Sequence, residues 1–232
     1  MKIIALQTAR AGSKSVANKN ITIVNGKPLY EHNISCALKS KYIEKIFIST
    51  DCEYILNNKI ENINYIRRPE ELSRDHSSHH DVMKHGVNFI EEQSNKKIEY
   101  FVLLLGNSII RDYTKIDQAI EILNDKPEYD SVVTVSEFNM FNPYRAFKIE
   151  NDYLKNFMNN FQTYDNITSN DKNAFGSFYY LNGEFQVMRR KTVMSEGPAP
   201  FRWMGNNIYP MVLKNNMEVD SQWQLEYLRS II

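Results

Sequence analysis

The sequence predicts an α/β protein built on a doubly wound, mostly parallel, Rossmann-like sheet. Short apolar runs rich in isoleucine, valine and phenylalanine alternate with segments of helical period over residues 2–137, which is the pattern of successive β-α-β units. The chain has 232 residues, of which 42% are hydrophobic and 24% charged. This is the composition of a globular protein, and the chain is long enough to form a stable core without disulfide bonds or structural metals. We therefore expect a single domain over residues 1–232.

The expected strands are short and apolar. Lys2–Thr8 opens the sheet, and Tyr100–Leu105 is apolar throughout, as in a strand covered on both faces. The remaining expected strands are Ile46–Ser49, Asn62–Ile66 and Ser131–Glu137, and the core is expected to resume at Phe178–Arg189 and to include Ile208–Leu213.

The expected helices lie between these strands. Pro28 suits the first turn of a helix that runs to Ser40 with a periodic apolar face. Ser78-His79-His80-Asp81 has the capping-box pattern, which predicts a helix from His79 to Gln93. The other expected helices open at Asp51 and span Thr114–Leu123 and Ser221–Ile231.

Residues 138–172 interrupt the regular pattern and are expected to form an insertion within the domain. They are rich in asparagine and predict one hairpin, Arg145–Glu150 and Tyr153–Met158, with its turn at Asn151-Asp152. Their aromatic side chains need something to cover them; these are Phe141, Tyr144, Phe147, Tyr153, Phe157 and Phe161. The insertion either packs on its own sheet or contacts a second subunit, and the residues alone leave both open.

Charge and cysteine usage limit the possible partners and compartments. Lysine plus arginine number 28 and aspartate plus glutamate 28, so the basic excess typical of nucleic-acid-binding proteins is missing. Cys36 and Cys52 lack metal-binding or redox spacing and fit a reduced, cytoplasmic protein. No apolar stretch approaches the ~20 residues of a membrane span. A local cluster of cations could still bind an anionic small molecule.

The loop after the first strand, residues 9–20, is the first candidate site. It offers Arg10, Lys14 and Lys19 at the carboxyl end of a strand, where open α/β sheets bind ligands. Gly12 allows close backbone approach to a phosphate, and cations can neutralise it. The loop matches neither the Walker A nor the dinucleotide-binding pattern. From these residues alone, a phosphate site and a solvated basic loop remain open.

Two further groups of residues could bind a metal. Glu218 and Asp220 flank one residue and could offer oxygen ligands to Mg²⁺, although taken alone the pattern favours a helix cap at Asp220 and a surface acid at Glu218. Four histidines fall close together, but they lack a completing cysteine or acidic pair, so we interpret them as solvated or substrate-lining. They are His76, His79, His80 and His85.

The chain resembles the CMP-sialic acid synthetases and the related cytidylyltransferases for Kdo, legionaminic and pseudaminic acids. The first loop carries the pattern A-R-x-x-S-K-x-x-x-x-K-N over residues 9–20. Other segments match in the same order and cover nearly the whole chain. They are Gly26-Lys27-Pro28-Leu29, Ser49-Thr50-Asp51, Arg68-Pro69-Glu70-Glu71-Leu72 with Asp75, Asn182-Gly183, and Glu218-Val219-Asp220 with Ser221.

The resemblance implies a nucleotidyltransferase that transfers CMP from CTP to an acidic α-keto sugar with Mg²⁺. It also implies a homodimer in which the insertion of one subunit helps close the sugar pocket of the other. It implies catalytic roles for Arg10, Lys19 and Asp220, with Asp220 and Glu218 as metal ligands. The residues that it implies at the nucleotide are Gly12, Ser13, Lys14, Asn20, Arg68 and Ser78, and those at the acceptor sugar are Ser108, Arg111 and Asn182.

The sequence also departs from the family pattern, as in a divergent member. Leu105 replaces the glutamine expected to contact the acceptor, Glu184 replaces alanine in N-G-A, and Ser15 replaces glycine in the first loop. An apolar side chain cannot replace the hydrogen bonds of an amide. Two alternatives therefore stay open: a catalytically weak nucleotide-binding relative, and a nucleotidyltransferase for a different acceptor.

Overall fold

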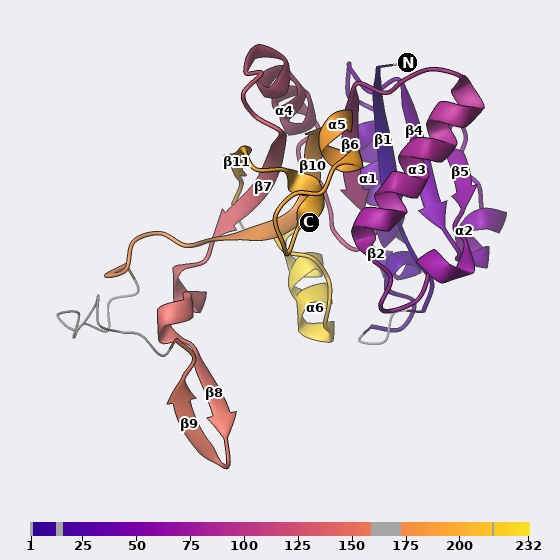
Figure 1. The fold of residues 1–232 in the computed structure, drawn as a ribbon. Helices are drawn as coiled ribbons and strands as arrows, with labels where there is room; N and C mark the ends of the chain where they lie inside the picture. The colour runs from indigo at the N-terminus through magenta and orange to yellow at the C-terminus, as the bar shows by residue number, and fades with distance from the viewer. Residues whose placement is uncertain (1, 13–15, 159–172, 215) are drawn as a thin grey trace.

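The computed structural model describes residues 2–12, 16–158, 173–214 and 216–232. Its centre is a seven-stranded sheet with strand order β11-β7-β10-β6-β1-β4-β5 (Figure 1). The strands are β1 Ile3–Thr8, β4 Lys45–Thr50, β5 Asn64–Arg67, β6 Tyr100–Leu105, β7 Ser131–Glu137, β10 Tyr179–Arg189 and β11 Ile208–Val212. The first five were expected from the sequence as strands, and the segments of β10 and β11 were expected in the core.

The sheet is mostly parallel, as predicted. Strand β1 pairs in parallel with β4 and β6, β4 with β5, and β7 with β11. Strand β10 runs antiparallel to both of its neighbours, β6 and β7. The carboxyl ends of β1, β4, β5 and β6 therefore meet at one edge, where the first loop also begins.

Helices cover both faces of the sheet, which confirms the doubly wound class. One buried cluster joins the sheet to α1 (Leu29–Ala37), α2 (Glu53–Asn57) and α4 (Thr114–Asp125). A second cluster on the other face joins it to α3 (His79–Ser94) and α5 (Arg190–Met194). Met83, Val87 and Ile90 supply the apolar stripe of α3 at spacings of three and four residues. The core thus lies on both sides of the central strands.

The C-terminal helix α6 (Gln222–Ser230) belongs to a third cluster, away from the two sheet faces. Leu225 and Leu228 pack with Val24, Leu29 and Val219. This packing brings residues 218–220, which precede α6, next to the segments that follow β1. Residues distant in sequence are thereby assembled at the carboxyl edge of the sheet.

The sequence analysis missed several short elements. Strands β2 (Ile23–Val24) and β3 (Lys27–Pro28) pair around Asn25 and Gly26, both at positive φ, as in a two-residue hairpin turn. Runs of two residues carry no periodicity to detect. The 3-10 helices are Lys19–Ile21, Glu70–Leu72, Asn139–Phe141, Pro143–Arg145 and Arg202–Met204.

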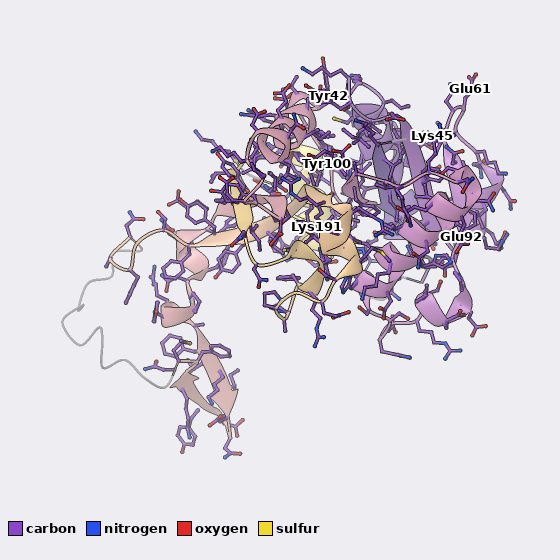
Figure 2. All side chains as sticks on the ribbon, turned by 45° about the horizontal axis from the view of Figure 1, so that its top comes forward. Tyr42, Lys45, Glu61, Glu92, Tyr100 and Lys191 are labelled. Atoms are coloured by element: carbon purple, nitrogen blue, oxygen red, sulfur yellow. The ribbon has the colours of Figure 1, made fainter. Side chains whose placement is uncertain are left out.

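The predicted hairpin of the insertion is present as β8 (Phe147–Glu150) and β9 (Tyr153–Asn156). Asn151 and Asp152 occupy its turn at positive φ. It projects away from the sheet, and its side chains stand apart from the body of the domain (Figures 1 and 2). The hairpin strands therefore do not pack on the seven-stranded sheet. Phe161 lies outside the described residues.

Candidate active site

A cavity of about 300 Å³ opens at the carboxyl edge of the parallel strands. Thr8 and Leu105 are the last residues of β1 and β6, and Arg68 directly follows β5. Ligands of open α/β proteins bind at this edge. The other lining residues come from the first loop, α3, β6 and the loop after it, β10, and the segments before β11 and α6: Arg10, Lys19, Asn20, His79, Leu103, Asn107, Leu181, Gln186, Phe201, Trp203 and Glu218.

The beginning of the first loop is fixed by hydrogen bonds from neighbouring segments. The Thr50 hydroxyl donates to the carbonyl of Ala9 at 2.5 Å, and the Ala11 N–H donates to the Asp51 carboxylate at 2.7 Å. The side-chain amide of Asn20 donates to the carbonyl of Arg10 at 2.8 Å. These bonds hold Arg10 at the cavity. Gly12 follows at φ +70°, and Ser13 and Lys14 lie outside the described residues.

Two predicted cations line the cavity and are each paired with a carboxylate. The guanidinium of Arg10 lies 2.8 Å from Asp75. The ammonium of Lys19 lies 2.6 Å from Asp220 and donates to the carbonyl of Val219 at 2.9 Å. Anionic ligands entering the cavity would therefore compete with these carboxylates for the same donors.

Arg68 is a third cation at the cavity, and it is buried. Its guanidinium donates to the hydroxyl and the carbonyl of Ser49, at 3.2 and 2.7 Å. Burial lowers the pKa of Arg68 to about 10, so the side chain stays charged at neutral pH. Because these hydrogen bonds fix the guanidinium in place, it can bind an anion without reorganisation of the side chain.

Glu218 and Asp220 come together at the end of the cavity nearest α6. Glu218 is half-buried and lines the cavity, and the side-chain amide of Asn107 lies 3.4 Å from its carboxylate. Burial raises the pKa of Glu218, and the negative charge of Asp220 raises it further. Asp220 is exposed beside Lys19, and Ser221, not Asp220, occupies the N-cap position of α6. The cap interpretation of Asp220 is therefore wrong.

Four other predicted residues do not reach the cavity. Ser108 and Asn182 are fully buried, and their side chains donate to the carbonyl of Gly183 and the hydroxyl of Ser136, respectively. Arg111 pairs with Glu184 on another side of the loop that follows β6. Ser78 is exposed at the N-cap position of α3, one residue before His79, without a side-chain capping bond. Their placement does not support direct substrate contact.

The histidines of α3 differ in their hydrogen-bond partners, although the rings of His79 and His80 both contact Trp203. His79 lines the cavity, and its Nε2 lies 3.1 Å from the Thr8 hydroxyl. Burial, helped by the nearby charge of Arg68, lowers the pKa of His79 to about 4, so the ring is neutral at pH 7. His80 is buried against the Val193 carbonyl. Among the residues that the structure describes, no three histidine, cysteine or acidic side chains form a metal-binding group.

An apolar wall at the cavity was only partly predicted. Leu105 lines it, as the sequence analysis proposed, together with Leu181, Phe201 and Trp203. The Trp203 indole packs edge-on against the rings of His79 and Phe201 and donates to the Gln186 side chain at 2.8 Å. Phe201 and Trp203 come from a segment between elements, where no periodicity marks them. The sequence signal for this part of the wall was the close spacing of the two aromatic residues, Phe201 and Trp203.

The fold and the cavity define an α/β protein with a ligand site at the carboxyl edge of its sheet, lined by cations and by one of two adjacent carboxylates. A family model described as cytidylyltransferase matches residues 4–216. The chain therefore belongs to the cytidylyltransferase family, which confirms the resemblance seen in the sequence.

Curated relatives share this assignment. The chain is 30% identical over 209 residues to the CMP-N,N'-diacetyllegionaminic acid synthase of Legionella pneumophila, covering 86% of each protein. It is 35% identical over 139 residues to an N-acylneuraminate cytidylyltransferase of Escherichia coli, covering 60% of this chain and 32% of that protein. A match to a bifunctional pseudaminic acid cytidylyltransferase of Helicobacter pylori covers 29% of that protein. The chain thus spans about a third of the length of these last two relatives.

Solved structures confirm the fold. A CMP:2-keto-3-deoxy-manno-octonic acid synthetase complexed with CTP aligns with a TM-score of 0.68 at 17% identity, covering 100% of this chain and 98% of that one. A 4-diphosphocytidyl-2C-methyl-D-erythritol synthase aligns with a TM-score of 0.65 at 9% identity. In the described part of the chain, no helix has the length and apolar character needed to cross a bilayer.

Proposed function

We propose that the protein transfers CMP from CTP to an acidic α-keto sugar of the nonulosonic acid type and releases pyrophosphate, in the cytoplasm and for surface polysaccharide biosynthesis. The observation that carries this proposal is the cavity, which Arg10, Lys19 and Arg68 line together with Glu218. Family membership gives the nucleotide, since the relatives with the longest shared segments are named for CMP transfer to such sugars.

The chain's residues have distinct roles in the proposed reaction. Arg10 and Lys19 bind the triphosphate and stabilise the charge that develops on the leaving pyrophosphate. The anomeric hydroxyl oxygen of the acceptor forms a bond to the α-phosphorus and loses its proton to solvent, and the bond from that phosphorus to the pyrophosphate oxygen breaks. Asn20 holds the Arg10 backbone, and Arg68 supplies a buried positive charge beside the nucleotide. Positioning and charge carry most of such a reaction.

Glu218 and Asp220 fit a Mg²⁺ site. They are two hard oxygen ligands close enough for the charge of one to raise the pKa of the other, a repulsion that a cation would relieve. Mg²⁺ is commonly bound by one or two carboxylates together with substrate phosphates. When bound, the metal supplies charge neutralisation for the triphosphate. Lys19 would then exchange its contact with Asp220 for a phosphate oxygen.

A pyrophosphate-release assay with CTP, Mg²⁺ and a panel of acidic sugars tests the proposal. Release is expected with nonulosonic acids, and CTP with Mg²⁺ should raise the melting temperature more than ATP or UTP does, because only the folded state binds nucleotide. A larger shift with ATP or UTP would contradict the cytidylyl assignment. Stabilisation by CTP without turnover on any acidic sugar would instead favour the second candidate, a weak nucleotide-binding relative, which Leu105 suggests.

The apolar wall favours an acceptor with a deoxy or N-acyl group at that position over a heavily hydroxylated one. Leu105→Gln restores the amide of the family pattern and should move relative kcat/KM toward the hydroxylated acceptor, by about a hundredfold at most. Leu105→Met keeps the wall apolar at similar volume and should leave the preference unchanged. A wild-type preference for the hydroxylated sugar would overturn this assignment.

We also propose a homodimer that forms through the hairpin. Phe147, Ile149 and Leu154 share one face of β8–β9, because Ile149 is directly opposite Leu154 and Phe147 is two residues away. This face is exposed, with Ile149 at 76%. Lys148, Glu150 and Lys155 form an ion-pair network on the opposite face. An exposed apolar face backed by charges fits a subunit contact.

Light scattering at micromolar concentration measures this association. The wild type should have twice the mass of the chain, and Ile149→Lys should shift it toward the monomer because it places a charge in an apolar contact. Lys155→Gln, on the charged face, should leave the mass unchanged. A wild-type protein that is monomeric and fully active would contradict the proposed dimer and show that the hairpin is not needed at the active site.

A further inference from the structure

The Glu218 side chain rests on a bulge in strand β10. The pairing of β10 with β7 shifts register between Leu181 and Gln186, and Gly183 lies inside the shift at φ +72°. A β-carbon on Gly183 would lie 2.1 Å from Cγ of Glu218 and 2.9 Å from its Oε1. The side chain therefore lies directly against the Gly183 backbone, so the position of the bulge determines the position of the carboxylate.

Buried hydrogen bonds fix the bulge. The Ser108 hydroxyl donates to the carbonyl of Gly183 at 2.5 Å. The Glu184 N–H donates to the Asn182 side chain at 3.1 Å, and that side chain donates to the Ser136 hydroxyl at 3.1 Å. Bulges of this kind re-aim side chains next to active sites. These contacts give Ser108 and Asn182 a structural role in place of the predicted contact with the acceptor.

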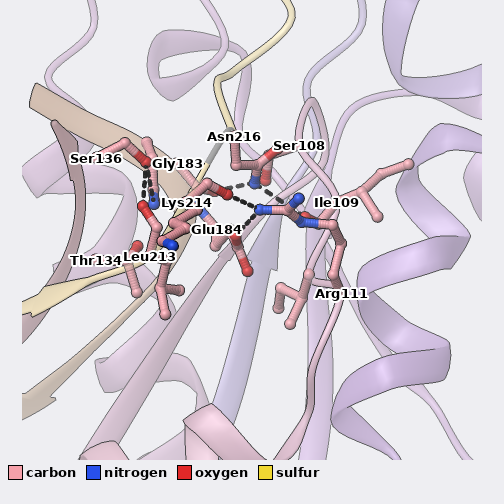
Figure 3. Close-up of polar contacts among 12 residues, drawn as sticks. Ser108, Ile109, Arg111, Thr134, Ser136, Gly183, Glu184, Leu213, Lys214 and Asn216 are labelled. Atoms are coloured by element: carbon pink, nitrogen blue, oxygen red, sulfur yellow. Dashed lines mark hydrogen bonds and ion pairs between the residues drawn. The ribbon is translucent and has the colours of Figure 1, made fainter. Parts of the chain in front are cut away.

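The guanidinium of Arg111 joins the bulge to the segment that carries Glu218. It lies 3.4 Å from the Glu184 carboxylate and also donates to the carbonyl of Lys214 (Figure 3). Asn216 continues the same contact by donating to the carbonyl of Ile109 at 3.0 Å. Lys214 precedes Glu218 by only four residues. The Arg111 side chain thus connects the bulge, through Glu184, with the backbone segment that leads to Glu218.

Glu184 is the chain-specific part of this arrangement. It is 2% exposed, so an unpaired charge there would be costly, and its carboxylate is paired with the Arg111 guanidinium and also contacts the Asn216 side chain. The resemblance to known cytidylyltransferases predicts alanine at this position, which could not pair with an arginine. The buried carboxylate of Glu184 is therefore a departure from the family pattern, as is Leu105 at the end of β6.

We propose that Glu184 and Arg111 are positioning residues whose ion pair sets the Glu218 carboxylate for metal binding. The proposal rests on the proposed function, since it assigns Glu218 to the metal. Residues that orient metal ligands typically change metal affinity about ten- to a hundredfold when replaced. Neither residue lines the cavity, so their effect should appear in metal binding and not in metal-free nucleotide binding.

Glu184→Gln tests the proposal with Mn²⁺ as the probe. In the presence of CTP, the loss of the free-ion electron paramagnetic resonance signal gives the Mn²⁺ dissociation constant without any turnover. The variant should bind Mn²⁺ about tenfold more weakly, while calorimetry should show unchanged affinity for CTP in the absence of metal. Glu91→Gln is the matched control, because Glu91 is also a buried carboxylate paired with an arginine, Arg190, at 2.8 Å. It should leave Mn²⁺ affinity unchanged.

Arg111→Gln provides an independent variant at a partly exposed position, and it should weaken Mn²⁺ binding to a similar extent. The double variant should lose no more than either single one, because each removes the same connection. Folded single variants with wild-type Mn²⁺ affinity, or a loss matched by Glu91→Gln, would overturn the proposal. A wild type that binds no Mn²⁺ with CTP would instead overturn the proposed function itself.

Discussion

Replacing Asp220 with alanine is expected to lower the rate of pyrophosphate release by at least about a hundredfold. A metal ligand contributes several kcal/mol of transition-state charge stabilisation, and each ~1.4 kcal/mol is a factor of ten in rate. Fold stability should change little, because the carboxylate is exposed and its partner, Lys19, keeps its hydrogen bond to the Val219 carbonyl. The measurement is kcat with saturating CTP and acceptor, with circular dichroism as the check on folding.

Glu53→Ala is the matched control for this variant. Glu53 forms an exposed ion pair with Arg67 at 2.5 Å, outside the lining of the cavity, and its removal should leave kcat within about twofold. A folded Asp220→Ala protein with wild-type kcat would show that the carboxylate serves only as a partner for Lys19. Glu218→Gln should also reduce turnover, since Glu218 lines the cavity itself.

Most of the sheet could be predicted from the sequence because its strands are apolar runs of four or more residues. Tyr100–Leu105 and Ser131–Glu137 have the predicted bounds, because each is buried up to its last residue and follows a polar residue. The antiparallel direction of β10 could not be predicted, since direction depends on long-range pairing and leaves no periodic mark. The short strands β2 and β3 escaped for the opposite reason, as two residues have no period.

The site was predictable where its residues occur in consecutive motifs and not where they are brought together by folding. Arg10, Lys19 and Asn20 share one loop, and the structure places all three at the cavity. Trp203 and Gln186 come from separate segments that only tertiary packing unites. Arg111 was predicted at the acceptor from its motif, but the motif did not show that Glu184 would bind its guanidinium. Arg111, which matches the motif, therefore has a partner, Glu184, that the motif does not include.

Removing the charge of Lys19 should reveal whether it binds phosphate or only holds the segment around Asp220. Lys19→Ala is expected to reduce kcat/KM for CTP by about ten- to a hundredfold, because a hydrogen bond to a charged group contributes about 1.5–3 kcal/mol. Its Nζ now contacts Asp220 and the Val219 carbonyl. A phosphate oxygen of CTP would therefore replace the Asp220 carboxylate as the negatively charged partner of Lys19.

Calorimetry of CTP binding without metal separates the two roles. If Lys19 contacts the triphosphate, Lys19→Ala should weaken metal-free CTP binding, whereas a tether of residues 219–220 would affect only the metal-dependent part. Lys41→Ala provides the control, because Lys41 forms an exposed pair with Glu121 at 2.9 Å outside the cavity lining and should leave CTP affinity within about twofold. Equal CTP affinities in the Lys19→Ala and wild-type proteins would exclude Lys19 from the phosphate site and leave Arg10 and Arg68 as its cations.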